Sequence, residues 1–231
     1  MVASIGNLNA TASKEKSEEV FRIYWLITFW IYGITTTCLM NLFQPFICFW
    51  IGCDYLLNDI TMISIVTLYF IVGMMIPVSN YRTTMGLFRQ GQLRPLIMVF
   101  VNITLSIALI KPLGIAGVFI GTIISKIVVQ AWFDPWIVYK YGFERSVKPY
   151  YVTYLKYVAI MILTLLISDY LCKLVALADM FQLLYILFIS VMIPNLIFFI
   201  LFYKTKEFCI IKNKATSLLK KEKNGERKNE D

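Results

Sequence analysis

The stretch YWLITFWIYGITTTCLMNLFQPFICFWI, Tyr24–Ile51, decides the class of fold, because its 28 residues include no charged side chain. A helix needs about 20 mostly apolar residues to cross the roughly 30 Å hydrocarbon layer of a bilayer. A membrane-spanning strand needs only about 10 residues, with apolar and polar positions alternating, and no such alternation occurs here. The stretch therefore predicts a transmembrane helix.

Five further apolar runs follow this one. They are Ile60–Arg82, Leu96–Ile110, Ile115–Tyr139, Tyr151–Leu171 and Leu183–Tyr203. Apolar residues make up 59% of the 231 residues, charged residues make up 16%, and the mean hydropathy is +0.70. A water-soluble domain of this size cannot hide so much apolar surface, and a disordered chain is excluded except at the ends. We expect an all-α integral membrane protein with six transmembrane helices.

The distribution of positive charge predicts how the spans are oriented. Of the 22 lysines and arginines, nineteen lie in segments that an even number of spans places on one side, and only Lys111 and Lys173 lie on the other. Cytoplasmic loops carry such an excess, so both termini are predicted to be cytoplasmic. We therefore divide the chain into a cytoplasmic amino-terminal segment (1–22), a transmembrane domain (23–203) and a basic cytoplasmic tail (204–231).

The two ends are predicted to differ in order. Lys14–Arg22 is expected to form a short helix on the cytoplasmic face, and the residues before it lack the apolar core of a signal peptide. The charged tail is expected to be loosely ordered. It is either a solvated tail that only fixes topology or a segment that lies on anionic lipid.

Several chemistries are excluded by composition. The chain has no histidine, which removes His-containing zinc sites, Ser-His-Asp triads and Cys-His pairs. The five cysteines form no C-x-x-C pair and are interpreted as small packed apolar residues. No nucleotide-binding loop is present, and the net charge of +8 follows the membrane pattern, not that of a nucleic-acid binder. We expect no enzyme activity, no cofactor, no metal and no nucleic acid.

Lys126 needs an explanation, because it lies about 16 Å into its span, near the middle of the bilayer. A charge at that depth costs about 2.5–3.5 kcal/mol on insertion scales, so the side chain should face protein or water. Gln130 and Asp134 follow at intervals of four and share its stripe, and Gln130 could bridge the two charges. Lys126 contributes either to a polar path that contacts an anionic headgroup or to an interhelical charge pair.

Two other features carry alternative interpretations. Asp134-Pro135 suits a helix start, so the helix is expected to break there and to restart within an interfacial aromatic cluster of Trp132, Trp136, Tyr139 and Tyr141. Gly117, Gly121 and Ser125 have the spacing that lets another helix approach closely.

Arg82, Arg89 and Arg94 cluster at the end of the second apolar run, with Gly86 and Gly91 between them. Guanidinium groups bind phosphate through paired hydrogen bonds, which suits a diphosphate lipid or a phospholipid headgroup. The alternative is that these arginines only determine topology.

Four segments in order resemble the polysaccharide flippases of the multidrug/oligosaccharidyl-lipid/polysaccharide exporter superfamily, which move capsular or O-antigen repeat units. The segments are ASIGNLNATASKEKSEEVF (Ala3–Phe21), FWIGCDYLL (Phe49–Leu57), MGLFRQGQLRPL (Met85–Leu96) and GIAGVFIGTIISK with FDPWIVYKYGF (Gly114–Phe143). Family members have two inverted-V lobes. The resemblance implies that the six spans are the last four helices of the carboxyl lobe and two terminal helices, in a truncated or split product whose amino lobe is encoded separately.

The resemblance also implies a function. It implies transport of undecaprenyl-diphosphate-linked oligosaccharide across the bacterial cytoplasmic membrane by alternating access, with membrane lipids and a separate amino lobe as further partners. Arg82, Arg89, Lys126 and Asp134 are the candidate substrate-binding residues, at positions where relatives often hold polar or charged groups. The alternatives are a membrane enzyme acting on lipid-linked sugars, such as a polymerase or acyltransferase, and a non-catalytic assembly subunit.

Overall fold

A computed structural model describes residues 2–175 and 179–227 of the chain. Over these residues the chain is helical, with no β-strand. The longer elements are α1 (Val2–Thr11), α2 (Lys14–Trp50), α3 (Asp59–Thr84), α4 (Arg94–Leu113), α5 (Ile115–Ser125), α6 (Ala131–Ile137), α7 (Lys148–Leu174), α8 (Asp179–Phe202) and α9 (Lys206–Arg227). Short 3₁₀ turns are η1 (Cys53–Tyr55) and η2 (Arg89–Gly91), and π-helical turns are η3 (Lys126–Gln130) and η4 (Val138–Phe143).

Six helices in the described part of the chain are long and apolar enough to cross a membrane. They are α2, α3, α4 with η2, the continuous helix from α5 to η4, α7 and α8. Each contains one of the six predicted apolar runs. The all-α class and the six candidate transmembrane helices are therefore confirmed, and the inverted-V arrangement stays a prediction.

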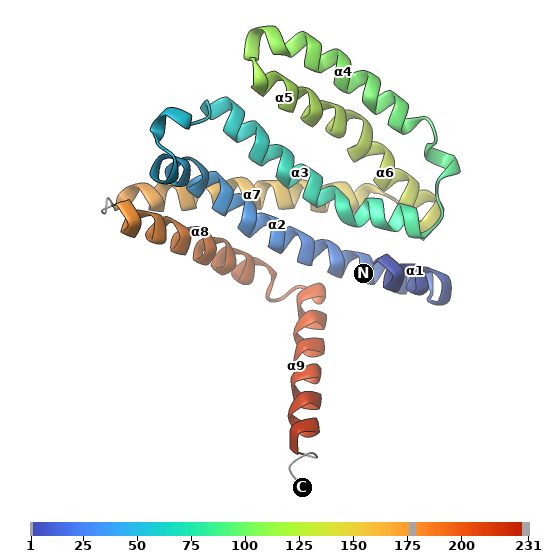
Figure 1. Ribbon diagram of the computed structural model, residues 1–231. Coiled ribbons are helices and arrows are strands. Elements are labelled where there is room, and N and C mark those ends of the chain that lie inside the picture. The colour runs from blue at the N-terminus through green and yellow to red at the C-terminus, as the bar shows by residue number, and fades with distance from the viewer. Residues whose placement is uncertain (1, 176–178, 228–231) are drawn as a thin grey trace.

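Helix α2 lies at the centre of the bundle, where it packs against α3, α7 and α8 (Figure 1). On the other side of α3 lies α5, and α4 covers α5 at the edge of the molecule (Figure 1). The α4–α5 contact is close because glycine faces backbone. A Cβ atom on Gly117 would overlap the carbonyl of Leu109, and one on Gly121 would lie 2.9 Å from the Ser106 nitrogen. The prediction that this glycine stripe packs against another helix is confirmed.

Aromatic side chains fill the half of the bundle that contains the start of α2. Trp25 stacks on Tyr150 with ring centroids 4.4 Å apart, and Phe29 stacks on Tyr157 at 4.4 Å. The Tyr81 hydroxyl donates to the Ser17 carbonyl oxygen at 3.2 Å. Large buried rings contribute most of the apolar burial here, and they fix the end of α3 against α2 and α7.

The segments predicted to be cytoplasmic meet at this same end of the bundle. Glu18 lies between two arginines that belong to different segments. Its carboxylate accepts from Arg22 Nη2 at 2.5 Å and from Arg145 Nη1 at 2.8 Å. We call these three residues the Glu18 cluster. An ion pair between Lys14 and Glu144 lies beside it.

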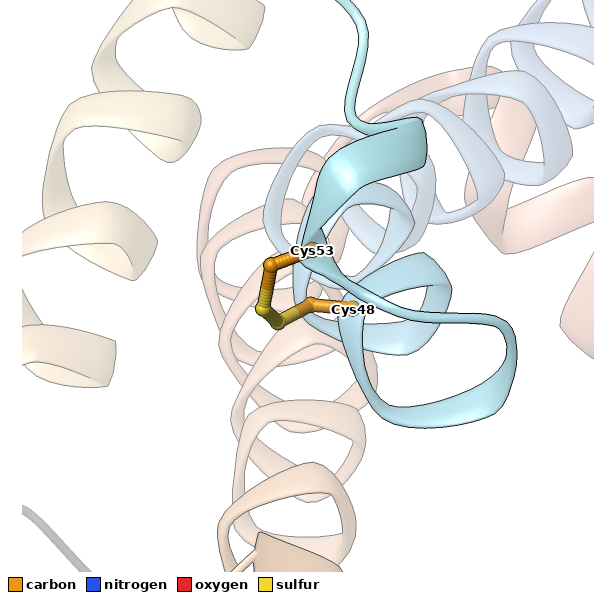
Figure 2. The surroundings of a disulfide bond; sticks show 2 residues. All are labelled: Cys48 and Cys53. Atoms are coloured by element: carbon orange, nitrogen blue, oxygen red, sulfur yellow. A yellow bond between two sulfur atoms is a disulfide. The ribbon is translucent and has the colours of Figure 1, made fainter.

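At the opposite end, a disulfide joins Cys48 to Cys53 (Figure 2). Cys48 lies in the last turn of α2 and Cys53 begins η1, and the chain reverses between them at Gly52, whose φ is 112°. This reversal brings the two Cα atoms to 4.1 Å. The interpretation of these two cysteines as packed apolar residues is therefore wrong, whereas Cys38, Cys172 and Cys209 are free.

Both ends of the chain are more regular than predicted. Lys14–Arg22 is not a separate helix but the first part of α2, capped by Ser13, whose Oγ accepts from the Lys16 nitrogen at 3.3 Å. Most of the tail forms α9. The expectation of a loosely ordered tail is wrong for residues 206–227, and the last four residues lie outside the described part.

Candidate functional site

The candidate site consists of Arg82, Arg94 and Asp134, which we call the Asp134 cluster. Arg82 lies in the last turn of α3, Arg94 begins α4, and Asp134 lies in α6. The short connection that contains η2 turns the chain back between α3 and α4. Both guanidinium groups therefore reach the same carboxylate, and the side chains are largely enclosed, with exposed fractions of 14%, 11% and 3%.

The contacts in this cluster leave hydrogen-bonding capacity unused. Arg94 Nη1 donates to Asp134 Oδ2, and Arg82 Nη1 forms an ion pair with Asp134 Oδ1 at 3.2 Å. The Arg82 contact lacks hydrogen-bond geometry. Among the described residues, Arg82 Nε and Arg94 Nε are also buried without an acceptor. A buried N–H that lacks an acceptor is costly, so the cluster is suited to receive another anionic oxygen.

Local backbone features bring these groups together. Gly91 is buried against Arg82, and a Cβ atom there would lie 2.8 Å from Arg82 Nη1. Helix α6 lies between η3 and η4, and each π-helical turn adds a residue without breaking the helix. The predicted helix break at Asp134-Pro135 is wrong. Asp134 is not a capping residue, because its carboxylate is used by the two arginines.

Lys126 lies one to two turns deeper in the bundle than Asp134. Its Nζ donates to Gln130 Oε1 at 3.4 Å, and Gln130 Nε2 donates to Ser79 Oγ on α3 at 3.2 Å. No carboxylate forms an ion pair with Lys126 among residues 2–175 and 179–227. The interhelical charge pair considered for Lys126 is therefore not found in this part of the chain, and its charge is stabilised by an amide alone.

The depth of the cluster follows from the helix rise. Arg82 lies about 35 Å along α3 from Asp59, and Asp134 lies about 28 Å along the α5–α6 helix from Ile115. Since the hydrocarbon layer is about 30 Å thick, these residues lie near one of its boundaries, where lipid phosphates are found. Lys126 lies well inside the layer.

The electrostatic balance favours an anion. Arg82, Arg94 and Lys126 supply three positive charges, and Asp134 supplies the only negative charge in an ion pair with them among the described residues. Two arginines in a partly enclosed site can hold a diphosphate through paired hydrogen bonds. The excess charge gives such a group a reason to bind.

An apolar cavity of about 210 Å³ borders the cluster between α3, α6 and α7. Asp134 and Gln130 form part of its wall, and aromatic side chains such as Trp132, Tyr150 and Tyr154 form much of the rest. The cavity has room for a short stretch of an apolar chain. An anionic group and an apolar tail could thus be held side by side.

The structure brings together three of the four residues predicted for the site. Arg82 and Asp134 are in contact and Lys126 lies near them, whereas Arg89 is exposed on η2 and makes no ion pair among the described residues. Arg94 was not among the predicted site residues. Its position next to Pro95, at the start of a helix facing the Arg82 segment, is the sequence signal that could have identified it.

The predicted aromatic cluster is only partly formed. Trp136 and Tyr141 are in ring contact at 5.8 Å, and Trp132 contacts Tyr151. Tyr139 is buried in the core against Phe21 and does not lie at the surface.

Comparisons of the chain with protein-family models, with curated proteins and with solved structures found no match.

Proposed function

We propose that this chain takes part in moving lipid-linked oligosaccharide repeat units, carried on undecaprenyl diphosphate, across the bacterial cytoplasmic membrane. The observation that carries the proposal is the excess of enclosed positive charge around Asp134, with guanidinium N–H groups that lack acceptors. A diphosphate supplies the missing acceptors, and the neighbouring apolar cavity suits part of a polyprenyl chain.

The roles of the residues follow from their positions. Arg82 and Arg94 hold the diphosphate at the membrane boundary, and Asp134 keeps both guanidinium groups in place. Lys126 extends the positive potential toward the middle of the bilayer. Alternating access requires two parts that move against each other, so the proposal includes a second set of helices, in a partner chain, that faces this bundle.

The proposal places the basic end of the bundle in the cytoplasm. The disulfide at the other end supports this orientation, because disulfides persist in oxidising compartments outside the cytoplasm. In intact cells, a membrane-impermeant maleimide should label a thiol introduced as Lys111→Cys, at the α4–α5 turn, and should not reach Cys209. The reverse pattern would refute the orientation.

Binding of the lipid is the direct test. The chain in lipid nanodiscs should bind undecaprenyl diphosphate at least about tenfold more tightly than uncharged undecaprenol, which corresponds to about 1.4 kcal/mol. Arg82→Lys with Arg94→Lys keeps the charge but removes the planar fork, and it should abolish most of this preference. Arg89→Lys is the matched control and should leave it unchanged, because Arg89 lies outside the cluster. Equal binding of the two lipids would refute the proposal.

A further inference from the structure

Helix α9 leaves the bundle in a direction different from that of the other long helices. It runs crosswise to α2 and α8, away from the rest of the molecule (Figure 1). The chain turns at residues 203–205, and the Thr205 hydroxyl accepts from the Phe208 nitrogen at 3.4 Å to begin the helix. Because the candidate spans cross the bilayer, a helix crosswise to them at their basic end lies along its surface.

The first turns of α9 show which side faces the bilayer. The Phe208 ring stacks on Trp30 and meets Phe199 edge-on, with ring centroids 5.8 Å apart in both pairs. Trp30 and Phe199 belong to the candidate spans α2 and α8. Ile211, one turn further, lies on the same face. By helical spacing, positions 215, 218 and 219 (alanine and two leucines) continue this apolar stripe beyond the bundle.

The angle between α2 and α9 encloses an apolar space. A cavity of about 270 Å³ is lined only by apolar side chains, Leu26, Ile27, Trp30, Ile31, Phe208 and Ile211. An acyl chain fits such a lining, whereas a hydrated polar ligand does not.

The charges of α9 complement an anionic membrane surface. Lys206, Lys212 and Lys214 are exposed, and two more lysines follow at positions 220 and 221. Glu207 is the only acidic residue among residues 206–221. By helical spacing, Lys212 and Lys214 lie on the two flanks of the apolar stripe. Lysines in that position reach headgroup phosphates while the stripe enters the acyl region.

We propose that α9 is an interfacial helix that binds anionic lipid of the cytoplasmic leaflet, with an acyl chain in the groove between α2 and α9 and the phosphate at Lys212 and Lys214. This binding surface is separate from the Asp134 cluster and does not depend on the proposed transport function. The solvated-tail alternative predicts no contact between the apolar stripe and lipid.

The test uses the full chain in vesicles of phosphatidylcholine, with and without phosphatidylglycerol. In a Cys209→Ser background, a fluorophore is attached at Ala215→Cys on the apolar stripe or at Ser217→Cys on the polar face. In vesicles containing phosphatidylglycerol, we expect spin-labelled lipid to quench position 215 several-fold more than position 217, and acrylamide in the water phase to show the opposite order. The difference should fall when phosphatidylglycerol is omitted.

Lys212→Glu with Lys214→Glu should remove the difference, while Lys111→Glu at the opposite end, as a matched charge change, should preserve it. Elution of each variant as the wild type in size-exclusion chromatography shows that the bundle is intact. Equal quenching at positions 215 and 217 would overturn the interfacial placement. A difference of the same size in pure phosphatidylcholine would overturn the assignment to anionic lipid.

Discussion

Two carboxylates in this chain are each held between two arginines, and the surroundings of the two clusters differ. The carboxylates of Glu18 and Asp134 are equally enclosed, with 4% and 3% of the side chain exposed. The arginines around Glu18 are 46% and 45% exposed, against 14% and 11% around Asp134. The same pairing therefore has two meanings: water compensates the extra positive charge at Glu18, whereas at Asp134 the protein must compensate it or a ligand must.

The clusters also differ in what they connect. The Glu18 cluster joins the start of α2 to the segment after η4, and Glu15 supplies a second carboxylate to Arg145. The Asp134 cluster joins α3, α4 and α6, and the cation nearest to it, Lys126, adds to the imbalance. The first arrangement is balanced and holds helices together. The second leaves free capacity at the depth of lipid phosphates.

The largest expected effect is that of Asp134→Asn. It leaves two enclosed guanidinium groups without a counter-charge, and removing one partner of a buried pair typically costs about 3–5 kcal/mol. The loss should appear as a lower free energy of unfolding in denaturant titrations of the purified chain in bicelles. Adding Arg82→Gln should recover part of this loss, because only one uncompensated guanidinium group then remains.

A smaller effect is expected for Glu18→Gln, the matched substitution in the other cluster. Arg22 and Arg145 remain hydrated, so only the hydrogen bonds to the charged carboxylate are lost, about 1–2 kcal/mol. The same titration measures it. Raising the salt concentration from about 0.05 M to about 1 M should reduce the loss for Glu18→Gln and leave that for Asp134→Asn nearly unchanged. If Glu18→Gln were as damaging as Asp134→Asn, water access would not be what separates the two clusters.

The smallest effect is expected for Gly91→Ala. The new methyl group would occupy the position of Arg82 Nη1 and displace the end of that flexible side chain from Asp134, while Arg94 keeps its hydrogen bond. We expect a loss of about 1 kcal/mol, similar to a modest overpacking cost. Gly6→Ala in α1 is the control, since its nearest neighbour would lie at 3.9 Å. Equal stability of the two variants would show that the Arg82 contact contributes little.

Hydropathy was sufficient to predict the six candidate spans, because the length and apolar content of each run are local properties. The glycine stripe on α5 was equally readable, since a small residue every fourth position leaves few other uses. What one run does to another is not local. Asp134 followed by Pro135 has the sequence of a helix start, and only the approach of α3 and α4 makes it an acceptor for two arginines.

The other misses have the same cause. Arg89 and Arg94 are close in sequence, but one lies on the exposed side of η2 and the other begins a helix that faces α6. The Cys48–Cys53 pair depends on a reversal at Gly52 that its spacing does not reveal. The tail has the charge of a solvated segment, and its helical stripe becomes visible only when Phe208 and Ile211 are seen against α2.

The π-helical turn η3 ties the phase of one helix to the site. Because an α-helix advances by about 100° per residue, deleting a single amino acid within Lys126–Gln130 would convert the turn to regular geometry and turn everything on one side of it relative to the other. Gly117 and Gly121 fix the phase at the start of this helix, so Asp134 would have to swing away from both arginines. Descendants of this sequence should therefore tolerate length changes in the 144–147 loop far more readily than in this five-residue segment.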